Sequence, residues 1–145
     1  MLITLGFKRV SIAPNGIEAL KIIRGHNCDL IISDWNMPQM NGLQLLQAIR
    51  ESSATAKIPF MMLTANIDPG DVKQAISSGV SEYLLKPFKL NTLKNKVRRA
   101  FSSPIPKKSI HEASTTADPH ETKNALRSIL IVDDEPNNIT VLQSY

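Results

Sequence analysis

One cysteine, few aromatic side chains and no long apolar run set the first limits on what this sequence encodes. The single cysteine, Cys28, excludes an intramolecular disulfide and favours a reducing compartment. Because the chain has no apolar run that could span a bilayer and opens with no secretory signal, we expect a cytoplasmic protein without a membrane segment. Its net charge of +4 comes without aromatic residues placed between the basic ones, which argues against a nucleic-acid partner.

Short apolar runs alternate with amphipathic segments along most of the 145 residues. Hydrophobic residues make up 42% of the chain, which is enough for one domain with a real core. We expect strands at residues 9–13, 30–33, 58–63, 83–85 and 129–132, and helices at residues 16–24, 42–50, 71–78 and 90–101. Strands that alternate with helices predict a doubly wound α/β fold, in which helices cover both faces of a parallel sheet.

Apolar residues at helical spacing predict which face of each helix turns toward the sheet. The inward residues expected are Ile17, Leu20 and Ile23 in the first helix, Leu43, Leu46 and Ile49 in the second, and Leu90, Leu93 and Val97 in the last. The basic residues of the last helix are then one solvated helix face.

The regular alternation stops after residue 101. Residues 102–127 are rich in Ser, Thr, Pro, Lys and His, so we interpret them as a flexible linker between segments 1–101 and 128–145. A last helix begins near Pro136 and is cut short at Tyr145, while the first residues look like a helix end capped by Gly6. When Tyr145 is joined to Leu2, one apolar stripe predicts that the two chain ends are halves of one helix: Ile139, Leu142, Leu2 and Leu5.

Three acidic residues follow two of the expected strands at the point where each strand ends. Asp133 and Asp134 follow the apolar run 129–132, and Asp34 follows residues 30–33. The carboxyl ends of parallel strands share one edge of a sheet, where clustered carboxylates repel one another and burial raises their pKa values. A hard divalent cation relieves that repulsion, and Mg2+ suits such oxygen ligands.

Two other strand ends carry groups that complement the acids. Lys86 offers a positive charge and Thr64 a hydroxyl donor. Each residue alone is ordinary at a strand end, and the combination carries the prediction. Acids, a divalent cation, a lysine and a hydroxyl together suit a phosphoryl group, because the cations neutralise charge on its oxygens.

The motifs at these strand ends form a specific set: Val132-Asp133-Asp134, Ser33-Asp34-Trp35-Asn36-Met37-Pro38 followed by Gly42, Leu63-Thr64-Ala65, and Tyr83-Leu84-Leu85-Lys86-Pro87-Phe88. Together they resemble the receiver domains of two-component response regulators, the CheY-like family. The resemblance covers nearly everything except the linker. It implies a five-stranded parallel sheet of order 2-1-3-4-5, in which the first strand is central. In this chain that strand is 129–132, near the end, and it must insert between residues 9–13 and 30–33.

The resemblance also implies a role for each site residue. Asp34 is expected to be the phosphoacceptor, which takes its phosphoryl group from a sensor histidine kinase or a phosphotransfer protein. Mg2+ is expected to bind Asp34, Asp133, Asp134 and the backbone carbonyl of Asn36. Thr64 and Lys86 are expected to contact the phosphoryl group, and the Lys86-Pro87 peptide bond is expected to be cis.

A switch surface follows from the same resemblance. Tyr83 is expected to turn inward when Thr64 moves toward the phosphate. The resulting signal is expected to reach a downstream signalling protein on the face formed by residues 71–78, 83–85 and 90–101. We expect a binding switch with self-catalysed phosphorylation and dephosphorylation, and no enzyme in the usual sense.

Alternatives remain open at this stage. The chain is a circularly permuted receiver that closes on itself, a domain-swapped dimer that exchanges residues 129–145, or a fragment of a tandem receiver protein. The alternative function is a non-phosphorylated scaffold or dimerisation module whose site is misassembled. A true phosphatase is disfavoured, because Asn36 stands two residues after Asp34, where a general acid would be needed.

Overall fold

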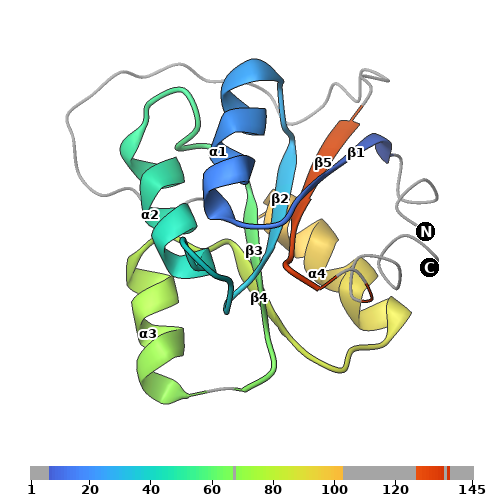
Figure 1. The fold of residues 1–145 in the computed structure, drawn as a ribbon. Coiled ribbons are helices and arrows are strands. Elements are labelled where there is room, and N and C mark those ends of the chain that lie inside the picture. The colour runs from blue at the N-terminus through green and yellow to red at the C-terminus, as the bar shows by residue number, and fades with distance from the viewer. Residues whose placement is uncertain (1–6, 67, 103–126, 136, 138–145) are drawn as a thin grey trace, which may run out of the picture.

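The fold is a single five-stranded parallel sheet with helices on both faces (Figure 1). The computed structural model describes residues 7–66, 68–102, 127–135 and 137. The strands are β1 (Phe7–Ala13), β2 (Leu30–Asp34), β3 (Phe60–Thr64), β4 (Glu82–Leu85) and β5 (Arg127–Val132). The helices are α1 (Gly16–Gly25), α2 (Gly42–Glu51), α3 (Pro69–Ser77) and α4 (Leu90–Ser102). The predicted fold class is therefore confirmed.

The strand order is β1-β5-β2-β3-β4, so the last strand of the chain occupies an interior position. Ile131 of β5 pairs with Ile12 of β1 on one side and with Ile32 of β2 on the other. All four strand pairs are parallel. The predicted insertion of this strand between residues 9–13 and 30–33 is confirmed. Numbered along this chain, the order 1-5-2-3-4 is a permuted form of the order 2-1-3-4-5.

The sheet separates two hydrophobic clusters, and β5 contributes to both of them. Ile129 and Ile131 belong to the cluster beneath α4, whereas Leu130 and Val132 belong to the cluster beneath α1, α2 and α3. All four side chains are at most 1% exposed. A strand buried on both faces needs a continuous apolar run rather than an alternating one, which explains this part of the sequence.

The helix starts follow from polar caps, and in α1 the predicted inward face is correct for Ile23 and Leu20 but wrong for Ile17. Asn15 and Asn41 each cap a helix by accepting a hydrogen bond from a backbone N–H in its first turn. In α1, Ile17 is 39% exposed, whereas Gly16 and Ala19 are buried. Met40 packs against Gly16 so closely that a Cβ there would overlap its side chain.

Several predictions about the chain ends fall outside the described residues. The proposed split helix, with Ile139, Leu142, Leu2 and Leu5, is among them, as are residues 103–126 of the expected linker. The two outer residues of that linker belong to regular elements, since Ser102 ends α4 and Arg127 begins β5. Within the described part of the chain, no helix combines the length and apolarity needed to cross a bilayer.

Arg50 of α2 makes hydrogen bonds at the edge of the sheet where β3 and β4 begin. Its Nε donates to the carbonyl of Gly79, and its Nη1 donates to the carbonyls of Ala56 and Ile58, at 2.9, 3.2 and 2.7 Å. Burial lowers the pKa of the guanidinium to about 10. Gly79 has a φ of +89°, and a Cβ there would press on the Arg50 side chain. One side chain thus joins α2 to two loops.

Replacement of Arg50 by methionine is expected to lower the free energy of unfolding by about 2–3 kcal/mol, because charge-assisted hydrogen bonds to partly buried carbonyls are lost. Urea denaturation followed by circular dichroism measures the loss. Arg24→Met is the matched control, since Arg24 is exposed in the last turn of α1 and should cost less than about 0.5 kcal/mol. Equal losses in the two variants would contradict the proposed role.

Candidate phosphoacceptor site

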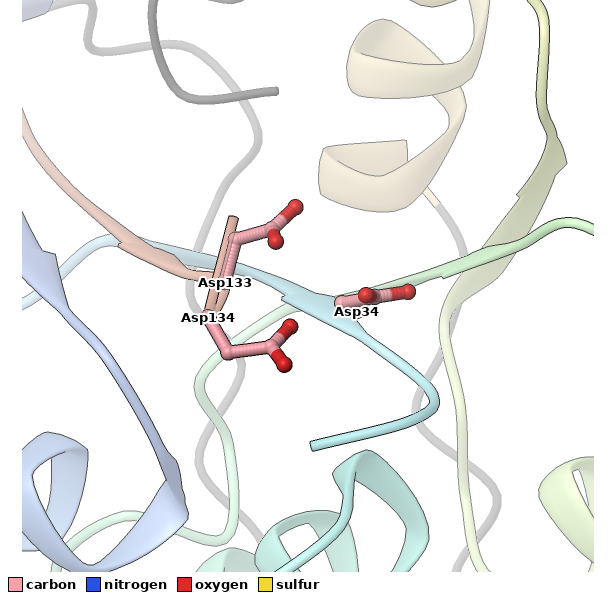
Figure 2. A group of neighbouring side chains, drawn as sticks. All are labelled: Asp34, Asp133 and Asp134. Atoms are coloured by element: carbon pink, nitrogen blue, oxygen red, sulfur yellow. The ribbon is translucent and has the colours of Figure 1, made fainter. Parts of the chain in front are cut away.

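Three carboxylates meet at the carboxyl edge of the sheet, as Figure 2 shows. Asp34 is the last residue of β2, and Asp133 and Asp134 follow β5 directly. The register pairs Ser33 with Val132, so the two strands end level with each other. Each acid places a carboxylate oxygen within 4.8 Å of the others. The structure therefore brings together the three acids that the sequence suggested.

Lys86 supplies the positive charge at this edge. Its Nζ lies 3.3 Å from Oδ1 of Asp34 and 3.6 Å from Oδ2 of Asp133. The backbone N–H of Lys86 donates to the carbonyl of Thr64 at 2.7 Å, which fixes the loop after β4 to the end of β3. The Lys86-Pro87 peptide bond is cis, as the resemblance implied.

The surroundings of Asp34 disfavour its ionised form. Its pKa is raised, chiefly because the carboxyl is partly buried and also because Asp133 lies nearby. Lys86 and the backbone N–H of Trp35 act in the opposite direction without reversing the shift. The ionised carboxylate is therefore stabilised by a nearby cation.

Two residues that hold Asp34 in place were not identified as functional from the sequence. The backbone N–H of Trp35 donates to Oδ1 of Asp34 at 2.9 Å and so orients the carboxylate. Gly42 packs against the backbone of Asp34 so closely that a Cβ would overlap the carbonyl oxygen, and its N–H donates to the carbonyl of Trp35 at 2.9 Å. Trp35 and Gly42 both belong to the quoted motif, and that was the only signal for their roles.

Thr64 lies at the same edge, and its hydroxyl makes its hydrogen bonds within its own turn. It ends β3, and its hydroxyl donates to the carbonyl of Asn66 at 2.6 Å and accepts from the N–H of Asn66. Asn36 is exposed in the loop after β2, two residues beyond Asp34. The hydroxyl of Thr64 is therefore engaged within its own turn and would have to leave it to reach a group on Asp34.

Tyr83 is half-buried on β4 and packs against the cluster beneath α1, α2 and α3. A narrow cleft beside it links Tyr83 to the site, with a lining that includes Trp35, Met62, Thr64 and Ala75. The predicted switch pair, Thr64 and Tyr83, thus shares one cleft.

The donor set fits Mg2+. Three carboxylates converge within 4.8 Å, all the donors are oxygen, and one acid, Asp134, is exposed to solvent while Asp133 is buried. Mg2+ prefers such hard oxygen ligands and usually keeps several waters. Asp34, Asp133 and Asp134 are the residues that would hold it.

Comparison with known proteins agrees with this geometry. The model of the response regulator receiver domain family matches residues 1–98. The chemotaxis protein CheY of Pseudomonas aeruginosa is 36% identical over 97 residues, which cover 67% of this chain and 78% of that protein. Among solved structures, the receiver domain of a signal transduction histidine kinase from Syntrophus aciditrophicus matches with a TM-score of 0.56 and 34% identity, over 69% of this chain and 76% of the other. The chemotaxis response regulator CheY4 of Vibrio cholerae matches with a TM-score of 0.58 and 26% identity, over 65% and 98%. The chain belongs to the response regulator receiver domain family.

Proposed function

We propose that this receiver domain is a phosphoacceptor switch and that Asp34 carries the phosphoryl group. The observation that carries the proposal is the position of the Asp34 carboxylate, 3.3 Å from Lys86 and within 4.8 Å of the two acids after β5. Membership of the family supports a histidine kinase or a phosphotransfer protein as the donor. The role is that of a switch rather than of a turnover enzyme.

The transfer forms one P–O bond and breaks one P–N bond. A carboxylate oxygen of Asp34 attacks the phosphorus of a phosphohistidine, whose imidazole leaves and takes a proton from solvent. Asp34, Asp133 and Asp134 would hold Mg2+, which would supply positive charge to the phosphoryl oxygens. Lys86 pairs with a phosphoryl oxygen, and the N–H of Trp35 keeps the carboxylate oriented during attack.

The switch begins at Thr64. Its hydroxyl leaves the carbonyl of Asn66 and donates to a phosphoryl oxygen, and Tyr83 moves further into the shared cleft. The altered face comprises residues 71–78, 83–85 and 90–101, where a downstream signalling protein binds. Phosphorylation adds charge and acceptor oxygens, and this local change biases a two-state element.

The same proposal includes circular permutation. The family match ends at residue 98, yet β5 lies between β1 and β2 and brings two of the three acids. Residues 1–101 and 128–145 then form one receiver, joined by the linker 102–127. A linker of this length gives the two segments a high effective concentration, which favours closure within one chain at low protein concentration.

The test is labelling with a small-molecule phosphodonor, such as acetyl phosphate, on protein separated by size. We expect Mg2+-dependent label in the monomer peak, and loss of the label on chelation of the metal, because the three acids need a cation before they accept more negative charge. Label confined to a dimer peak would replace closure within one chain by strand exchange. Absence of label from both peaks would overturn the phosphoacceptor assignment and favour a scaffold.

A further inference from the structure

Lys96 of α4 contacts two consecutive residues of β4 at once. Its Nζ lies 2.8 Å from Oε2 of Glu82 and 5.0 Å from the centroid of the Tyr83 ring. An ammonium group at that distance over a tyrosine face makes a cation–π contact. One side chain on α4 is therefore in contact with the residue that serves as the switch.

The two contacts lie on opposite faces of the sheet. Successive residues of a strand point to opposite faces, so Glu82 and Tyr83 diverge. Glu82 is buried and paired with α4, whereas Tyr83 packs against the cluster beneath α1, α2 and α3. Because β4 is the last strand in the sheet order, Lys96 reaches both residues across an open edge.

Arg99 is a second cationic partner of Glu82, in addition to Lys96. Its Nε lies 2.9 Å from Oε1 of Glu82, so the buried carboxylate is shared by two cations. If Lys96 loses its contacts with both Tyr83 and Glu82, Arg99 still neutralises the carboxylate of Glu82. Removal of Lys96 therefore does not leave an unpaired buried charge, which would be costly.

We propose that Lys96 is a positioning residue for Tyr83, and that its ammonium group, anchored by Glu82, holds the ring at the open edge of β4. This inference rests on the proposed function only in naming Tyr83 as the switch. Movement of the ring into the cleft lined by Trp35, Thr64 and Ala75 gives up the contact with Lys96. A partner whose carboxylate draws Lys96 away would favour the same movement, which links the switch to binding on α4.

The test measures the χ1 rotamer populations of Tyr83 from three-bond couplings in isotopically labelled protein without any phosphodonor. Lys96→Met, which keeps the apolar stem, is expected to raise the minor rotamer about two- to fivefold, in keeping with the size of an exposed cation–π contact. Lys96→Arg is expected to restore the wild-type populations, because a guanidinium also stacks on an aromatic face.

Lys94→Met is the matched control. It removes the same charge from the same helix, and Lys94 takes part in no ion pair or cation–π contact within the described ranges. Rotamer populations that stay unchanged in Lys96→Met, or that change equally in Lys94→Met, would overturn the positioning role. The measurement needs no phosphate on Asp34, so its failure is distinguishable from failure of the phosphoacceptor assignment.

Discussion

Deletion of residues 129–145 is expected to abolish cooperative folding of the remaining chain. The deletion removes the strand that pairs with both β1 and β2. Four aliphatic side chains that are at most 1% exposed go with it, two from each hydrophobic cluster. At about 1.5–3 kcal/mol for each, their burial is worth about 6–12 kcal/mol. That sum is comparable to the whole stability of a typical domain, which is about 5–15 kcal/mol.

Circular dichroism during urea denaturation measures the effect. We expect a broad, non-cooperative transition in the truncated chain, and a cooperative transition once a peptide of residues 127–145 is added in excess, because binding to the folded form shifts the equilibrium. A cooperative transition in the truncated chain alone would contradict the interior position of β5.

A matched pair of point variants isolates the contribution of the strand. Ile131 and Ile12 are register partners on neighbouring strands, but Ile131 is 0% exposed and Ile12 is 41% exposed. Ile131→Ala is expected to cost about 2–5 kcal/mol, since it leaves a cavity in a packed core. Ile12→Ala should cost much less, because solvent already reaches that side chain. Similar losses at the two positions would mean that β5 is not buried as described.

The sequence allowed most of the fold to be predicted because burial leaves a strong pattern. The run 129–132 is apolar at every position, as a strand buried on both faces must be. Ile17 shows where that reasoning fails, since its spacing suited an inward face but its side chain is 39% exposed, while Gly16 packs closely against Met40. A contact such as this one, between a glycine and a loop residue, leaves no periodic pattern in the sequence. Arg50, whose partners are backbone carbonyls of two loops, was missed for the same reason.

The site, too, could be predicted only in part from the sequence. Acids at strand ends could be placed because parallel strands share a carboxyl edge, so Asp34, Asp133 and Asp134 needed only the topology. The N–H of Trp35 on Asp34 and the ammonium of Lys96 on Tyr83 depend on a loop conformation and on the rotation of α4 about its axis. Neither quantity can be obtained from spacing alone.

Replacement of Asp34 by asparagine is expected to abolish phosphate incorporation and at the same time to stabilise the fold. The asparagine amide is not a nucleophile toward phosphorus, so label from the phosphodonor should fall to the level seen without Mg2+. The pKa of Asp34 is raised by burial and by Asp133, which means that the folded protein disfavours the ionised carboxylate. In the absence of metal, a neutral amide should therefore raise the free energy of unfolding at neutral pH.

The pH dependence provides a second measurement on the same variant. A carboxyl whose pKa is higher in the folded than in the unfolded protein lowers stability when ionised, and that loss disappears as the pH falls through the folded pKa. The advantage of Asp34→Asn over the wild type should therefore be largest at neutral pH and shrink on acidification. Asp68→Asn is the control, because it removes the same charge from an exposed helix cap that asparagine also satisfies, and it should keep full labelling. Wild-type labelling of Asp34→Asn would contradict the assignment, since the phosphoryl group would then reside on another residue.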